Sequence, residues 1–135
     1  MKCVVLGGAG FIGSHLAERL LSAGHAVRIF DQHEQGSTGW AAGRRDIEWV
    51  RGDFLSPEDV RGAIAGCQAV FHLAWTTLPR SSNEDPAADV ATNVIGTLHL
   101  LEAWRREAPG KFVFVSSGGT VYGVPRTVPI TEEHP

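Results

Sequence analysis

Hydrophobic residues gather in five short runs of strand length, separated by segments in which apolar residues recur with helical spacing. The runs cover residues 2–6, 26–30, 47–50, 69–73 and 111–115, and helices are predicted over residues 11–23, 57–65 and about 85–107. Strands that alternate with helices predict an α/β fold with a parallel sheet. Right-handed crossovers then favour the doubly wound arrangement of a Rossmann fold, with strand order 3-2-1-4-5, in one domain of residues 1–135.

The same pattern predicts which side of each helix is buried. The first helix is expected to bury one face, formed by Ile12, Leu16, Leu20 and Ala23. The second should start with Ser56 as N-cap and Pro57 in the first turn. The long third helix has apolar residues on two sides. Val90, Val94, Leu98 and Leu101 are expected to face the sheet, whereas Ala91, Ile95 and Trp104 extend the apolar surface around the side. This surplus leaves two alternatives open, a homodimer interface or burial by further chain.

Composition narrows the class of protein. Hydrophobic residues make up 43% of the chain and charged residues 20%, as in ordinary globular proteins. A net charge of -3 and only two adjacent basic pairs argue against a nucleic-acid partner. Cys3 and Cys67 are interpreted as reduced structural thiols, no metal site is expected, and no apolar run is long enough to span a membrane. We therefore expect a cytoplasmic protein. Residues 36–43, polar and rich in glycine, are expected to form a mobile loop.

A glycine motif directly follows the first predicted strand and opens the first helix. It contains Gly7, Gly10 and Gly13, with Phe11 and Ile12 at the helix start. Glycines at this spacing permit a tight turn and a close approach of the backbone to a pyrophosphate, which the free N–H groups of the helix N-terminus can bind. We therefore predict a dinucleotide site rather than a structural turn.

Asp31 ends the second predicted strand, 18 residues after Gly13. A carboxylate at this point accepts hydrogen bonds from the adenosine ribose and repels a 2′-phosphate, so NAD is expected in preference to NADP. A solvated turn residue is the alternative interpretation. Arg44 and Arg45 could serve a 2′-phosphate, but they lie well beyond the strand end.

Several further motifs follow in order along the whole chain. They are Gly52-Asp53-Phe54, His72-Leu73-Ala74, Asn93-Val94-Ile95-Gly96-Thr97, Val115-Ser116-Ser117 and Val121-Tyr122-Gly123. Together with the glycine motif they resemble the extended short-chain dehydrogenase/reductases that include nucleotide-sugar epimerases and dehydratases. The resemblance implies that Asp53 contacts the adenine amino group and that Phe54 lies by the ring. It also implies that Leu73 and Ala74 line the ribose and pyrophosphate path, that Asn93 anchors the long helix near the cofactor, and that Ser116 lies near the nicotinamide.

In the family that the chain resembles, a tyrosine acts as general base beside a lysine, and a Ser or Thr hydroxyl orients the sugar. Gly118 stands at the usual hydroxyl position, so Ser117 or Thr120 is expected to replace it, with Thr120 slightly preferred. Gly119 and Thr120 stand where dehydratases of this family carry an Asp-Glu pair. The resemblance therefore favours an enzyme like UDP-hexose 4-epimerase, with a nucleotide sugar as substrate, over a dehydratase.

The catalytic Tyr-x-x-x-Lys pair does not occur in these 135 residues. Tyr122 is the single tyrosine, Arg126 stands four residues later, and the glycine and proline that follow predict a turn rather than a helix around it. We therefore expect an NAD-binding portion truncated before the catalytic helix and the substrate domain, and inactive alone. Two alternatives stay open: a non-catalytic NAD-binding or redox-sensing module, and a dehydrogenase, reductase or dehydratase of the same family.

Overall fold

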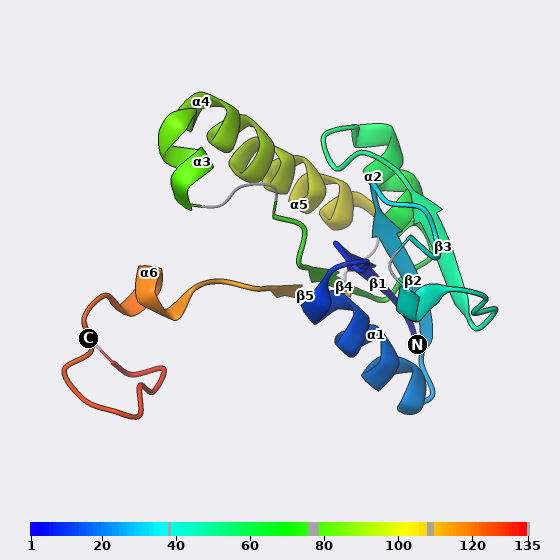
Figure 1. The fold of residues 1–135 in the computed structure, drawn as a ribbon, viewed down its shortest axis with the longest axis horizontal. Coiled ribbons are helices and arrows are strands. Elements are labelled where there is room, and N and C mark those ends of the chain that lie inside the picture. The colour runs from blue at the N-terminus through cyan, green and yellow to red at the C-terminus, as the bar shows by residue number, and fades with distance from the viewer. Residues whose placement is uncertain (38, 76–78, 108–109, 135) are drawn as a thin grey trace.

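The computed structural model describes residues 1–37, 39–75, 79–107 and 110–134. A single parallel sheet forms its centre (Figure 1), with strand order β3-β2-β1-β4-β5 as predicted. The strands are β1 (Lys2–Leu6), β2 (Ala26–Asp31), β3 (Ile47–Arg51), β4 (Ala69–His72) and β5 (Lys111–Phe114). β2 and β3 extend one residue beyond the prediction because Asp31 pairs with Arg51 in the ladder, and β4 and β5 end one residue before it.

Helices cover both faces of the sheet, in the three-layer arrangement of a Rossmann fold. On one face, α1 (Phe11–Ser22) packs through Ala17 on Val5, Val27 and Ile29. On the other face lie α2 (Pro57–Ile64) and the long helical segment made of α4 (Pro86–Asp89), the π-helical turn η2 (Val90–Ile95) and α5 (Gly96–Glu107). Ser56 caps α2 as predicted, since its hydroxyl accepts a hydrogen bond from the Asp59 N–H at 3.2 Å.

Three short helices were not predicted. They are η1 (Gly39–Ala41), α3 (Pro79–Glu84) and α6 (Gly118–Tyr122). Within 36–43, where a mobile loop was expected, η1 is regular structure and buries Ala41 completely. Tyr122 is the last residue of α6, so the prediction that it lies outside a helix is wrong. Such segments of three to six residues are too short to show a helical period in the sequence.

The predicted buried face of α1 is wrong at both ends. Ile12 is 60% exposed and Ala23 is also exposed, whereas Gly13, Ser14 and Ala17 are buried. The glycine loop passes directly beneath the first turn of this helix. A Cβ atom on Gly13 would lie 2.5 Å from the Gly7 carbonyl oxygen, so only the smallest residue fits there. Close backbone packing, and not hydrophobicity, therefore selects this face.

The long helix also turns a different side to the core from the one predicted. The apolar residues expected to face the sheet are all 41–50% exposed: Val90, Val94, Leu98 and Leu101. Asn93, Gly96, Leu100 and Trp104 are buried instead. The aromatic ring of Phe54 lies against Gly96, where a Cβ atom would come within 2.7 Å of the ring. A small residue is required at this contact, so the helix presents the side that carries Gly96.

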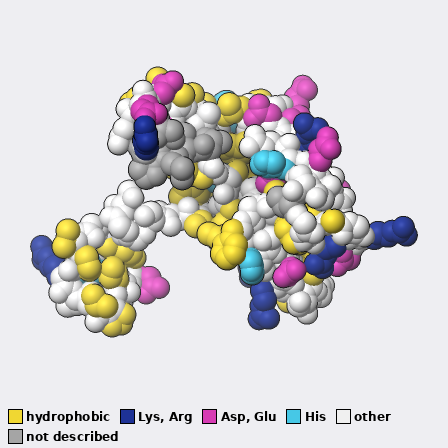
Figure 2. All heavy atoms as spheres, viewed as in Figure 1, with side chains coloured by type: hydrophobic (Ala, Val, Ile, Leu, Met, Phe, Trp, Pro, Cys, Tyr) yellow, Lys and Arg dark blue, Asp and Glu magenta, His cyan; other side chains and the backbone are white. Residues whose placement is uncertain are grey.

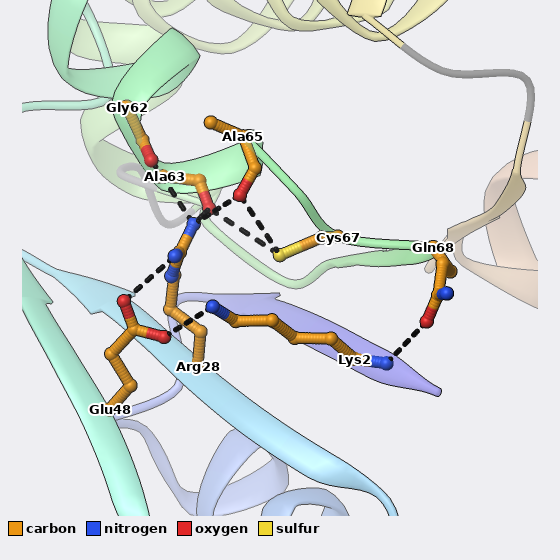
Figure 3. A network of polar contacts seen from close by, with 8 residues as sticks. All are labelled: Lys2, Arg28, Glu48, Gly62, Ala63, Ala65, Cys67 and Gln68. Carbon is orange, nitrogen blue, oxygen red and sulfur yellow. Dashed lines mark hydrogen bonds and ion pairs between the residues drawn. The ribbon is translucent and has the colours of Figure 1, made fainter.

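A buried arginine holds the C-terminal end of α2 against the sheet (Figure 3). The guanidinium of Arg28, on β2, donates hydrogen bonds to the carbonyl oxygens of Gly62, Ala63 and Ala65 at 2.6–3.1 Å. It also pairs with Glu48 at 2.7 Å, and the ammonium group of Lys2 contacts the same carboxylate at 2.7 Å. The hydrogen bonds from Arg28 and Lys2 lower the pKa of the Glu48 carboxyl. A cation at a helix C-terminus satisfies carbonyl groups that the helix leaves unpaired.

The two cysteines lie in the core as free thiols, as predicted. Cys3 and Cys67 are both buried, and burial raises the pKa of each thiol. The Cys67 thiol contacts the carbonyl oxygens of Ala63 and Ala65 beside Arg28 (Figure 3). Buried thiols with a raised pKa are poor nucleophiles, which agrees with a structural role.

Beyond β5 the chain leaves the body of the domain. Figure 1 shows α6 and the segment after it at a distance from the sheet, and hydrophobic side chains gather there on the surface in Figure 2. Val121, Val124 and Val128 are 60–91% exposed. β5 itself is an edge strand whose Phe114 is 46% exposed, as expected from its position in the sheet order. No helix in the described part of the chain has the length and apolar character needed to cross a membrane.

Candidate functional site

Two adjoining hollows lie at the carboxyl ends of β1, β2 and β4, on either side of the glycine loop. Their volumes are about 420 and about 960 Å³. Five residues line both hollows: Gly7, Gly10, Leu73, Ala74 and Trp75. Ligands of doubly wound sheets bind at this edge, where the chain crosses from one face of the sheet to the other. The groove formed by the two hollows is therefore the candidate site.

The glycine loop closes tightly between two strand ends. Gly7 has a φ of +77°, a conformation that favours glycine, and a Cβ atom there would lie 2.9 Å from the backbone nitrogen of Ala74. The Gly7 N–H donates to the carbonyl oxygen of Phe30 at 2.9 Å. Side chains larger than hydrogen at Gly7 or Gly13 would push the loop away from β4 or from α1.

The N-terminus of α1 opens into the larger hollow. Its N-cap is Gly10, which has no side chain to satisfy the N–H groups of the first turn, and Phe11, Ile12 and Gly13 line the hollow. Phe11 is 82% exposed. Unpaired N–H groups and the positive end of the helix dipole favour an anionic group at this place, as a pyrophosphate would provide.

Asp31 forms one wall of the smaller hollow, directly beside the glycine loop. Its side chain is only 9% exposed. Carboxylate atom Oδ2 accepts a hydrogen bond from the Ala9 N–H at 3.0 Å, and Oδ1 accepts from the N–H of His33 at 3.1 Å and from its ring Nδ1 at 2.7 Å. The acid that the sequence singled out is thus held against the loop, with its carboxylate at the edge of the hollow.

Asp53 and Phe54 form the opposite wall of the smaller hollow. The Asp53 carboxylate accepts from the N–H of Leu55 at 2.9 Å, and the Asp53 N–H donates to Asp59 at 2.8 Å. Phe54 is 8% exposed and packs on the ring of His72, with centroids 5.0 Å apart. Asp53 therefore offers a polar edge to the hollow, whereas Phe54 is mostly a core residue with one edge at the surface.

The larger hollow collects the hydroxyl groups that follow β5. Ser116, Ser117 and Thr120 all line it, together with Phe114 and Val115. Ser117 is the N-cap residue of α6, but its hydroxyl makes no capping hydrogen bond. Both predicted replacements for the usual hydroxyl therefore lie in the same hollow as the start of α1.

His72 lies at the end of β4 and is 2% exposed. Its Nε2 and the hydroxyl of Thr97 are 2.9 Å apart, and that hydroxyl donates to the Asn93 carbonyl oxygen. Because the hydroxyl proton is used on Asn93, Nε2 carries the imidazole proton. Burial lowers the pKa of His72 to about 4, so the ring is neutral at pH 7. A buried, neutral imidazole is consistent with a structural role for His72.

Asn93 is the one predicted contact residue that lines neither hollow. It is 3% exposed in the π-helical turn, where its amide nitrogen donates to Asp89 at 2.6 Å. The groove also includes residues that were not predicted from the sequence, among them Ala9, His33 and Trp75. Trp75 follows Ala74 at a strand end, a position that the strand-end rule could have identified. No sequence signal marks the contact between His33 and Asp31.

Comparison with known proteins places this geometry in a family context. A model of the NAD dependent epimerase/dehydratase family matches residues 3–135. The UDP-glucose 4-epimerase of Mycolicibacterium smegmatis is 39% identical over 140 residues, which covers 100% of this chain and 44% of the relative. The mouse sterol-4-alpha-carboxylate 3-dehydrogenase, decarboxylating, is 35% identical over 121 residues, covering 90% of this chain and 31% of the relative.

Solved structures give the same result. The UDP-glucose 4-epimerase of Thermus thermophilus, in complex with NAD, is 37% identical with a TM-score of 0.84. The match covers 100% of this chain and 44% of that one. The chain thus spans less than half the length of these relatives.

Proposed function

The chain belongs to the NAD dependent epimerase/dehydratase family, and from this premise we propose that it is the NAD-binding portion of a nucleotide-sugar epimerase. The observation that carries the proposal is the groove, in which an uncapped helix N-terminus and the strand-end acid Asp31 lie on the two sides of one glycine loop. An anion-binding end and a ribose-binding end on one path match the shape and charge of a dinucleotide.

The residues of the groove fit NAD in three respects. Gly7 and Gly13 leave no room for a Cβ atom, so the loop packs closely on β4 and α1 and holds the N-terminus of α1 at the groove, where a pyrophosphate would bind. Asp31 offers acceptor atoms for ribose hydroxyls, and Asp53 offers a polar edge to the adenine. Ser116, Ser117 and Thr120 offer hydroxyls where the nicotinamide and the reacting sugar would meet. NAD, when bound, supplies the hydride acceptor and donor of the reaction.

The two residues that precede Val121 support the epimerase assignment. Gly119 and Thr120 lack the carboxylates that water elimination needs in dehydratases, and the UDP-glucose 4-epimerases of two organisms match the whole chain. Transient oxidation of a hydroxyl on a UDP-linked hexose is therefore the proposed reaction of the longer protein. A dehydrogenase that oxidises its substrate once is the second candidate, favoured by the likeness to the sterol dehydrogenase of mouse.

Titration of the chain with NAD and NADP tests the cofactor assignment. We expect NAD to bind more tightly, because Asp31 would repel a 2′-phosphate. Asp31→Asn keeps the size of the side chain and removes its charge, so it should narrow the difference, as should Asp31→Ala. Asp46→Asn is the matched control, because Asp46 is exposed, pairs with Arg44 and lies outside both hollows. Equal affinities of the wild-type chain for the two cofactors would contradict the assignment.

Product analysis tests the reaction. The 135-residue chain should not interconvert UDP-glucose and UDP-galactose, because proton transfer needs a base with a tuned pKa and Tyr122 has no lysine four residues on. A longer protein that carries a Tyr-x-x-x-Lys helix should interconvert them without net reduction of NAD. Accumulation of NADH with an oxidised product would favour the dehydrogenase instead.

The exposed side of the long helix supports a homodimer. Val94 and Leu98 are 49% and 50% exposed and stand one helical turn apart, with Val90 and Leu101 continuing the stripe. Contiguous apolar side chains on a helix favour association through a second helix. A second copy of this chain is the proposed partner, and light scattering of the wild type and of Leu98→Glu tests it.

A further inference from the structure

The short segment after β2 carries a histidine in direct contact with the strand-end acid. His33 donates two hydrogen bonds to Oδ1 of Asp31, one from its backbone N–H at 3.1 Å and one from its ring Nδ1 at 2.7 Å. Its side chain is 55% exposed and lies at the edge of the smaller hollow. The imidazole therefore stands between the carboxylate and the solvent.

Side chains from β3 hold this segment in place. The indole N–H of Trp49 donates to the carbonyl oxygen of His33 at 3.0 Å, and the guanidinium of Arg51 donates to the carbonyl oxygen of Gln32 at 3.1 Å. Arg51 also pairs with Glu34 at 2.6 Å. These contacts fix the backbone on both sides of the His33 side chain, so the ring can rotate while its attachment point stays at the rim.

The acceptor capacity of Asp31 is nearly used. A carboxylate has about four acceptor positions, two on each oxygen. His33 occupies both positions of Oδ1, and the Ala9 N–H occupies one of Oδ2. One position is left for a ligand. A ribose diol that engages both oxygens must therefore displace the ring nitrogen of His33.

We propose that His33 is a specificity-determining residue of this site, whose imidazole competes with the adenosine ribose for Asp31. The proposal rests on the proposed function, because it requires a dinucleotide in the groove. A displaced imidazole lies beside the ribose 2′ position, where its N–H can donate to a 2′-phosphate. His33 thus weakens the binding of NAD and reduces the disadvantage of NADP, and both effects lower the selectivity that Asp31 alone would give.

Substitution of His33 tests the proposal through the ratio of the dissociation constants for NADP and NAD. His33→Phe keeps a ring at the rim but removes both nitrogens. The ratio should rise about three- to tenfold, because NAD would no longer have to break the hydrogen bond between the His33 ring and Asp31. The ratio is the measure because stacking on the new ring would affect both cofactors equally. His33→Gln keeps an N–H donor and should stay closer to the wild-type ratio.

His25→Phe is the matched control, because His25 precedes the opposite end of β2 and lines neither hollow. It should leave the ratio unchanged. A second measurement follows the wild-type protein by NMR. The imidazole proton resonances of His33, assigned by their loss in His33→Phe, should shift on addition of NAD far more than those of His25.

The outcomes separate this inference from the proposed function. If NAD binds but the ratio of the dissociation constants for NADP and NAD changes by less than about twofold in His33→Phe, the change is smaller than one hydrogen bond would give. This result overturns the role of His33 and leaves the cofactor assignment in place. NAD binding without a shift of the His33 resonances does the same. Failure of the wild-type chain to bind either cofactor overturns both.

Discussion

Addition of one methyl group at Gly13 tests whether the loop geometry of this groove is required for cofactor binding. A Cβ atom at this position would lie 2.5 Å from the Gly7 carbonyl oxygen and 2.6 Å from the Gly8 Cα atom. Ordinary contacts between carbon atoms lie near 3.5 Å or more, so α1 and the loop would have to separate by about 1 Å. Both contacts are with backbone, which cannot rotate away as a side chain can.

The expected cost follows from two opposing effects. Alanine is favoured over glycine in a helix by about 0.5–1 kcal/mol. Overpacking costs about 1–3 kcal/mol, so Gly13→Ala should lower the free energy of unfolding by up to about 2.5 kcal/mol. Displacement of the first-turn N–H groups should weaken NAD binding by about tenfold or more, because a hydrogen bond to a charged group contributes about 1.5–3 kcal/mol.

Gly62→Ala is the matched control. Gly62 lies inside α2, and a Cβ atom there would meet nothing within 4 Å. This substitution should raise the free energy of unfolding by about 0.5–1 kcal/mol and leave NAD affinity unchanged. Urea denaturation and calorimetric titration measure the two quantities. If Gly13→Ala stabilised the protein as much as Gly62→Ala and bound NAD like the wild type, the close packing of α1 on the loop would not be required for cofactor binding.

Three further predictions concern stability and assembly. The free energy of unfolding should decrease by about 3 kcal/mol as the pH falls from 6.5 to 4, because unfolding releases His72 from a site that lowers its pKa to about 4 and lets it bind a proton. Urea denaturation should show a smaller decrease for His72→Phe, and an equal pH dependence of the wild type and the variant would contradict this. Arg28→Met should cost about 2–4 kcal/mol, since three carbonyl groups at the end of α2, one of them in a buried contact, lose their donor, whereas Arg45→Met at an exposed position should change little in the same assay. Light scattering should show a dimer at micromolar concentration that Leu98→Glu converts to a folded monomer, and a dimer that survives this change would place the interface elsewhere.

Local features of the sequence account for the strand order and for the positions of the glycine loop and Asp31. These were predicted correctly, because they depend on properties that neighbouring residues determine by themselves. The properties are the apolar runs, the turn conformation that only glycine adopts easily, and the chirality of crossovers. Gly7, with its φ of +77°, is an example in which the residue type alone indicates the backbone conformation.

Only the tertiary structure decided which side of each helix is buried and what surrounds Asp31. In the long helix, hydrophobicity favoured the stripe that includes Leu98, but the ring of Phe54 on the sheet side requires Gly96 at the contact. The contact of His33 with Asp31 depends on a local turn that Trp49 and Arg51 hold from another strand. The sequence by itself determines the strands, their order and the residue types at the strand ends. Helix orientation and the hydrogen bonds of the acid depend on partners distant in sequence, whose shapes no local pattern encodes.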